Sequence, residues 1–329
     1  MTSNKWSFPI YLVVVLVVMV VSACQSPDSE EVADPDELVI RDSVVCHSLM
    51  GKPLKYVPET VRSYRHKDSL LQIARANYEA DSRNLENIVW YGRRLAYLTE
   101  YPMAMTMYTR GLHLHPKSPE IYRHRGHRYI SMRRFDEAVN DLTLAAELAR
   151  GRDIEIEPDG IPNKLNKPLS SLQFNIWYHL GLAYYLQGKY DDAARAYETC
   201  LSYSTNDDLL TATTDWYYWT AIRMGDTLKA QALLEPIGRN MEIIENDAYH
   251  KRLLMYKGMI QPEDVMPLDS LGVTDAHIYV TQGYGVANYL KLTGRPEAGR
   301  AILERILETD SWPSFGYIAA EADKAGAVR

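Results

Sequence analysis

Residues 177–201 read WYHLGLAYYLQGKYDDAARAYETCL, two apolar stretches in which large and small side chains recur three and four residues apart. This spacing places those side chains on one face of an α-helix. Gly181 lies in the first stretch and Ala193 in the second, and such small residues let two helices approach closely. Large residues such as Trp177 and Tyr197 fill the holes beside them. The stretch therefore predicts a pair of antiparallel helices.

The same arrangement recurs upstream at a fixed period. Gly92 in WYGRRLAYL and Gly126 in YRHRGHRYI are 34 residues apart. Gly181 follows Gly126 by 55 residues, which is one period of 34 plus an insertion of 21. Self-similarity at a period of this length indicates a stack of repeated structural units. We therefore expect residues 58–329 to form one continuous array of helix pairs.

These units resemble the tetratricopeptide repeat, a 34-residue helix pair. The pattern is clear over 85–118, 119–152 and 174–207 and degenerate over 211–244 and 275–308. In the best-matching unit it is carried by Trp177, Leu180, Gly181, Tyr184, Ala193, Tyr197 and Cys200. The second unit departs from it at Arg125, where the family has Leu. The resemblance implies an all-α, right-handed solenoid with a concave groove, closed by cap helices at 68–80 and 314–325 because open stacks need them.

The first 23 residues predict a signal peptide. Lys5 precedes an unbroken apolar run over 10–21, which is shorter than the roughly 20 residues that a membrane-spanning helix needs. Val-Ser-Ala-Cys at 21–24 then resembles the bacterial lipoprotein lipobox, which implies cleavage before Cys24 and acylation of its thiol. A simple secretory signal or a short anchor is the alternative. We expect residues 24–57, acidic at first, to be an irregular tether and the protein to be attached to the bacterial outer membrane rather than the inner.

The charge of the chain is unevenly distributed. The 36 basic and 43 acidic residues give a net charge of −7, which argues against a nucleic-acid-binding protein. Residues 91–134 nevertheless carry nine Lys or Arg and two acids. We call this segment the basic island. Two interpretations remain open for it: a site for an external anionic ligand, or an internal network of ion pairs with acids such as those of 153–159.

The resemblance also implies which residues face the concave groove. Related repeat domains hold a peptide carboxylate with basic and Asn side chains at such positions. Carried over, the predicted partner-binding residues are Arg93, Tyr97, Arg123, His127, Asn175, Tyr178 and Tyr185. The insertion at 153–173 adds a loop longer than an ordinary connector, and loops of this length are often functional.

Motifs for catalysis and for metal binding are missing from the sequence. It has no G-x-S-x-G, H-E-x-x-H or phosphate-binding loop, and the acids of 153–159 lack the Gly and the final Glu of a calcium loop. We predict free thiols at Cys46 and Cys200 and no cofactor. The expected function is a non-catalytic scaffold that binds an envelope protein or an acidic peptide tail. The alternatives are glycan binding, suggested by rings such as Trp216–Trp219, including an anionic glycan, and an unrecognised envelope enzyme.

Overall fold

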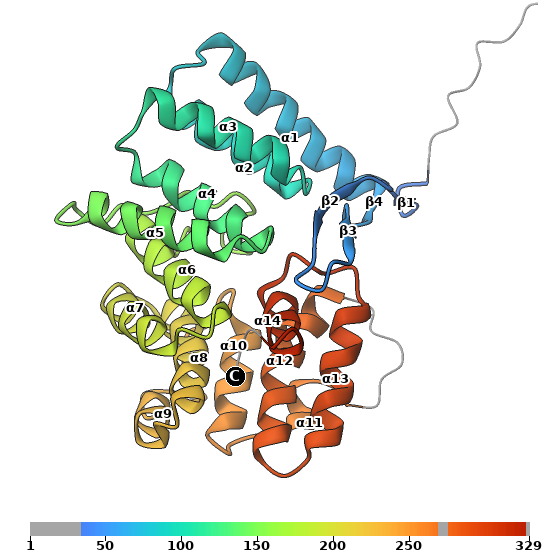
Figure 1. Ribbon diagram of the computed structural model, residues 1–329, viewed down its shortest axis with the longest axis vertical. Coiled ribbons are helices and arrows are strands. Elements are labelled where there is room, and N and C mark those ends of the chain that lie inside the picture. Colours follow the sequence, from blue (N-terminus) through green and yellow to red (C-terminus); the bar gives the residue numbers. More distant parts are fainter. Residues whose placement is uncertain (1–33, 269–275, 327–329) are drawn as a thin grey trace, which may run out of the picture. The chain divides into compact units, whose positions relative to one another are not determined.

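The computed structural model describes residues 34–268 and 276–326, in which fourteen α-helices and four short β-strands are present (Figure 1). The helices are α1 Val61–Ala80, α2 Leu85–Tyr97, α3 Tyr101–Leu114, α4 Pro119–Ser131, α5 Phe135–Ala149, α6 Leu172–Leu186, α7 Tyr190–Ser202, α8 Asp207–Met224, α9 Thr227–Leu234, α10 Asp247–Tyr256, α11 Pro262–Val265, α12 Ala276–Leu292, α13 Pro296–Glu308 and α14 Phe315–Lys324. In the described ranges, no helix is both long and apolar enough to cross a bilayer.

The predicted helix pairs are confirmed. The three clear units correspond to α2–α3, α4–α5 and α6–α7, and the two degenerate units to α8–α9 and α12–α13. The cap helices are α1, which starts at Val61 rather than at residue 68, and α14. No individual helix was assigned between residues 244 and 275 from the sequence. The structure has two helices there, α10 and α11. The predicted fold class, an all-α stack of helix pairs, is therefore correct.

The pairs start and turn at recognisable residues. The first helices of four pairs are capped by Asn84, Ser118, Ser171 and Asn206, each of which accepts a hydrogen bond from the backbone N–H three residues later. A side-chain cap of this kind satisfies one of the unpaired N–H groups of the first turn. The turns to the second helices use a left-handed residue, such as Gly188 with φ of 72°. The N-cap residues and the left-handed turn residues therefore determine where the helices of each pair begin and end.

Small residues hold the two helices of a pair together. A Cβ on Gly181 would lie 2.6 Å from Cε1 of Tyr197, and a Cβ on Gly92 would lie 2.3 Å from Cε1 of Tyr108. No side chain fits at these distances, so the ring of the second helix packs directly on the backbone of the first. Tyr108 and Tyr197 are almost completely buried. The close approach predicted from the sequence is thus the packing that the core uses.

The segment that leads into the first helix is folded, and the expected tether over 24–57 is wrong for its second half. Strands β1 (Leu38–Val39) and β4 (Glu59–Thr60) pair antiparallel, as do β2 (Val44–His47) and β3 (Pro53–Lys55). We call residues 44–55 the hairpin. Its Val45 and Leu54 are buried in the main hydrophobic core. Burial of these two side chains is the physical reason why the segment is ordered.

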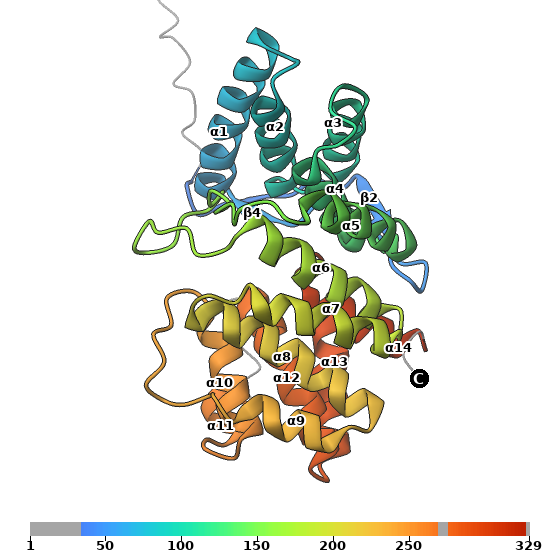
Figure 2. The ribbon, with the colours of Figure 1, turned by 90° about the vertical axis from the view of Figure 1, so that its left-hand side faces the viewer.

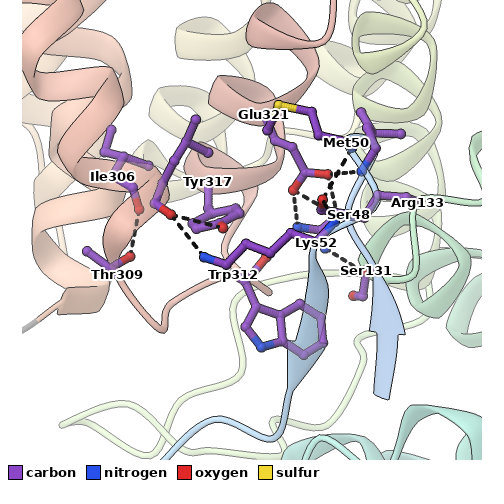
Figure 3. A network of polar contacts seen from close by, with 12 residues as sticks. Ser48, Met50, Lys52, Ser131, Arg133, Ile306, Thr309, Trp312, Tyr317 and Glu321 are labelled. Atoms are coloured by element: carbon purple, nitrogen blue, oxygen red, sulfur yellow. Dashed lines mark hydrogen bonds and ion pairs between the residues drawn. The ribbon is translucent and has the colours of Figure 1, made fainter. Parts of the chain in front are cut away.

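The last helices return to the earlier ones. Helices α1 to α9 follow one another along the stack, after which α10 packs against α8 and α14 against α6 (Figures 1 and 2). The hairpin lies between the α4–α5 turn and α14 (Figure 3). Glu321 of α14 accepts hydrogen bonds from the guanidinium of Arg133, at 2.7 Å, and from the backbone N–H of Leu49. Trp312 donates its indole N–H to the carbonyl of Lys55.

Replacement of Glu321 by Ala is expected to lower the free energy of unfolding by about 3 kcal/mol or more, because it leaves the Arg133 charge buried and unpaired. The side chains of Arg133 and Glu321 are 3% and 0% exposed. Glu137→Ala is the matched control, since Glu137 pairs with Arg134 on the same turn at the surface; we expect a loss below about 0.5 kcal/mol. Chemical denaturation measures both, and equal losses would contradict the structural role of Glu321.

Candidate functional site

The insertion between the second and third repeats lies over the basic island. Glu157 forms an ion pair with Arg123, at 3.2 Å from Nε, and lies 3.0 Å from Nε2 of His124. Its carboxylate also accepts a hydrogen bond of 2.6 Å from Nδ2 of Asn175. We call these four residues the Glu157 cluster. It joins α4, the insertion and α6, and all four side chains are nearly buried.

His124 links the two charges of this cluster as a neutral ring. Its Nδ1 accepts from Nη1 of Arg123 at 2.8 Å, so its proton lies on Nε2, which is 3.0 Å from Oε1 of Glu157. Burial, together with the neighbouring Arg123, lowers the pKa of His124 to about 3. Burial alone would raise the pKa of Glu157, but the charge of Arg123 and the polar ring of His124 outweigh it and lower that pKa. The ionised form of Glu157 is therefore the stable one.

Other cations of the basic island are also satisfied internally. Arg93 donates to the carbonyl of Pro158 at 2.8 Å, and Arg94 to the carbonyl of Gly160 at 2.9 Å. Arg125, which departs from the repeat pattern, forms two hydrogen bonds of 2.7 and 2.9 Å to Asp141 of α5. The structure therefore supports the internal interpretation for Arg93, Arg123 and Arg125. Pairing buried charges in this way avoids the large cost of an unpaired ion.

The remaining predicted site residues divide into two groups. Asn175 belongs to the Glu157 cluster, and Tyr185 is completely buried, with its hydroxyl 2.8 Å from that of Tyr284, so neither faces a groove. Tyr97 and His127 do line a cavity, and Tyr178 lies beside it with its ring 6.4 Å from that of Phe315. The repeat pattern predicted that all of the partner-binding residues face the same side of the stack. The positions of the insertion and of α14 determine which of them are accessible.

The central groove consists of two adjoining cavities that share His277, Ser314 and Phe315. The first, of about 420 Å³, is bounded by the β4 region, by the ends of α2 and α4, and by the segment before α14. The second, of about 450 Å³, lies between α10, α12 and the start of α14. The residues that line the first include Glu59, Lys67, Tyr97, Thr99, Tyr101, His127, Arg128, Ile161 and Pro313. Residues near the beginning and near the end of the described chain therefore both contribute walls to this groove.

Arg128 is the cation that distinguishes the first cavity. Its guanidinium lies 5.0 Å from the ring centroid of Tyr101, and it forms no hydrogen bond or ion pair with any residue in the described part of the chain. Lys67, in contrast, is paired with Glu59. Next to Arg128, the ring of His127 packs 4.2 Å from that of His179. Arg128 belongs to the basic island but was not among the predicted partner-binding residues. Its position in the sequence directly after His127, a predicted groove residue, was the signal that could have identified it.

The aromatic cluster at Trp216–Trp219 belongs to the core. All four rings are at most 6% exposed, and the indole N–H of Trp219 donates to the hydroxyl of Tyr256. Flat rings that bind sugars must be accessible, so this cluster offers no glycan platform. The predicted free thiols are confirmed, with Cys200 completely buried. Across residues 34–268 and 276–326, no group of three or more His, Cys, Asp or Glu side chains is arranged to hold a metal ion.

Comparison with known proteins agrees with this architecture. The profile of the tetratricopeptide repeat matches residues 174–207, which comprise most of α6 and all of α7. This helix pair is a tetratricopeptide repeat. The other pairs share its helix–turn–helix arrangement. A search of curated proteins gave no match.

Several solved structures are similar. The type IV pilus biogenesis factor PilW has 12% identity and a TM-score of 0.44, over 75% of this chain and 88% of its own. Pseudomonas aeruginosa PilF has 12% identity and a TM-score of 0.40, over 74% and 90%. YrrB, described as a TPR protein with an unusual peptide-binding site, has 13% identity and a TM-score of 0.39, over 71% and 91%.

The buried histidines predict that acid destabilises the fold. Burial lowers the pKa of His124 and His179 to about 3, and that of His127 well below its usual value. The unfolded chain binds protons at these rings near pH 6.5, whereas the folded chain does not. Stability is therefore complete above about pH 6.5 and falls steadily toward about pH 3. Glu157, with its lowered pKa, adds a loss of the same sign once its unfolded form takes up a proton, below about pH 4.5.

Denaturation as a function of pH measures this dependence. His179→Asn should reduce the slope of the free energy of unfolding between pH 4 and 6 by about 1.4 kcal/mol per pH unit, which corresponds to one proton. His113→Asn, at an exposed position of α3, is the matched control and should leave the slope unchanged. An unchanged slope in both variants would refute the assignment to the buried rings.

Proposed function

We propose that this protein is a non-catalytic scaffold that binds an acidic segment of a partner protein in the central groove. The observation that supports the proposal is the guanidinium of Arg128, which has no hydrogen bond or ion pair within residues 34–268 and 276–326 and lines a cavity of about 420 Å³. The helix-pair fold, with a tetratricopeptide repeat at 174–207, is consistent with a role in protein binding. The partner expected from the sequence was acidic, and we propose Arg128 as its anchor in place of Arg93 and Arg123, which are bonded within the fold.

The chemistry around Arg128 suits a carboxylate. A guanidinium offers two parallel N–H groups to the two oxygens of such a group. Beside it, His127 is neutral because burial lowers its pKa, and it adds a polar ring without a competing negative charge. Tyr97, Tyr101 and Phe315 supply apolar surface for the rest of the segment. Neutralisation of the deeper arginines within the fold leaves Arg128 to interact with an external acid.

The second cavity extends the groove for a longer segment. Beyond Phe315 it contains the hydroxyl of Tyr249, which accepts from Tyr178 at 3.2 Å and retains its own proton for a partner. Arg252 lines the same cavity, but its charge is neutralised by the buried Asp215. The bound segment would thus place its acid at Arg128 and neutral polar groups beyond Phe315.

Replacement of Arg128 by Gln is expected to weaken partner binding about tenfold or more, because a charge-assisted hydrogen bond contributes roughly 1.5–3 kcal/mol. Crosslinking in the native bacterial envelope, followed by titration of the captured partner against purified full-length variants, measures this effect. Arg110→Gln is the matched control, since Arg110 lies exposed on α3 within the same basic island. Equal affinity of the wild type and Arg128→Gln would refute Arg128 as the anchor.

We also propose that the protein is a lipoprotein of the bacterial envelope, anchored through Cys24 to the outer membrane rather than the inner. The signal peptide and Cys24 lie outside the described residues, and the support for this proposal is the sequence Val-Ser-Ala-Cys at 21–24 after an apolar run. An acyl chain gains about 0.8 kcal/mol per buried CH₂ group, so two or more chains give a stable anchor.

Metabolic labelling with palmitate tests this anchor. The label should be present in the wild type and in Cys46→Ser, because Cys46 lies in the hairpin as a free thiol. It should be lost in Cys24→Ser, together with sedimentation in the membrane fraction. Label that persists in Cys24→Ser would refute lipidation at that residue and would leave the binding function to be judged by the Arg128 variants.

A further inference from the structure

The insertion contains a short extended segment, Asp153–Glu157, with one satisfied edge. Ile156 is bridged antiparallel to Ser171, with hydrogen bonds from the N–H of Glu157 to the carbonyl of Ser170 and from the N–H of Leu172 to the carbonyl of Glu155. In this pattern the bridged residues themselves do not bond to each other, so the N–H and C=O of Ile156 point to the opposite edge. We call that opposite edge the outer edge.

The side chain of Gln173 extends this pairing by two residues. Its Nε2 donates to the carbonyl of Asp153 at 2.7 Å, and its Oε1 accepts from the N–H of Glu155 at 3.2 Å. The amide thus occupies the place of a further strand residue. Asp153, Glu155 and Glu157 are bonded toward the fold, whereas the N–H and C=O groups of Ile154 and Ile156 have no partner among residues 34–268 and 276–326.

The same two residues expose apolar side chains. Ile154 is 54% and Ile156 57% exposed. Unpaired backbone groups next to exposed branched side chains are the combination by which a strand edge accepts another strand. Natural proteins usually protect such an edge with charges, Pro or a covering loop. Here Pro158 lies beyond the extended stretch, and the one charged residue within 154–156, Glu155, forms an ion pair with Arg152.

A third cavity adjoins this segment. It measures about 410 Å³ and lies between residues 155–158, the first turns of α2 and the start of α4. Leu85, Val89, Trp90 and Leu172 give it apolar walls. Its charged lining consists of Glu86, Glu120, Glu155, Glu157 and Arg93. Glu157 pairs with Arg123, Arg152 pairs with Glu120 and Glu155, and Arg93 donates to the carbonyl of Pro158, whereas Glu86 has no ion pair in the described part of the chain.

We propose that the outer edge at Ile154–Ile156 binds an extended segment of another protein by β-strand addition. That segment has apolar residues at every second position, because alternate side chains of a strand point to one side, and one of them occupies the third cavity. It also carries a basic residue, which is complementary to Glu86. The acidic stretch 25–38 of this chain has the wrong charge for this surface. Arg128 is not part of this surface, so the inference does not rest on the function proposed above.

Selection of peptides tests the proposal. A random dodecapeptide library displayed on phage is screened against the immobilised full-length protein, and a selected peptide is synthesised. We expect alternating apolar residues with a Lys or Arg. Binding should be about tenfold weaker in Ile154→Pro, which removes one outer N–H and keeps the inner pairing, and similarly reduced in Ile156→Lys. Leu165→Asp is the matched control, since Leu165 is 65% exposed on the same insertion.

Hydrogen exchange distinguishes strand addition from mere contact. On binding of the selected peptide, the amides of Ile154 and Ile156 should exchange at least about tenfold more slowly, as expected for newly hydrogen-bonded groups, while those of Glu155 and Glu157 change little. The proposal is overturned if no peptide is selected, if Ile154→Pro binds as tightly as the wild type, or if the two amides gain no protection. It is also overturned if the wild type is a dimer that Ile156→Lys converts to a monomer, because the edge would then join two copies.

Discussion

The buried ion pair between Arg133 and Glu321 connects the beginning of the helix stack to its end. Glu321 also accepts from the backbone of Leu49, so a single carboxylate joins the α4–α5 turn, the hairpin and α14 (Figure 3). The central groove depends on this closure, because its first cavity takes walls from residues near 60, 97 and 128 and from 311–315. An open stack of the same helix pairs would present a broad surface instead of a bounded groove.

The closure has a cost in backbone conformation. Arg133 has a φ of 63°, in a turn where the equivalent residue of the next repeat is Gly188. A left-handed conformation costs a non-glycine residue roughly 1–2 kcal/mol. Arg133 offsets it with hydrogen bonds to Glu321, to the carbonyl of Ser131 and to the carbonyl of Trp312.

The local features of the fold were predictable from the sequence, and the long-range ones were not. Gly92 and Gly181, each with an aromatic sixteen residues later, specify helix pairs because both partners lie in one short segment. Glu321 and Arg133 are 188 residues apart, and no local pattern links them. The role of Glu157 was open for the same reason: acids near a basic island are visible in the sequence, but which cation they neutralise depends on the path of the insertion.

The insertion connects the two proposed binding surfaces physically. Its residues 155–158 form a wall of the third cavity, and Ile161, a few residues later, lines the central groove. Between them, Arg93 and Arg94 of α2 hold the carbonyls of Pro158 and Gly160. Two sites that share one segment are coupled energetically when ligands favour different positions of it. If the segment moved away from α4, Glu157 would leave Arg123 and expose a second cation on the concave side. The position of the insertion therefore sets both the shape of the outer edge and the charge available to an acidic partner.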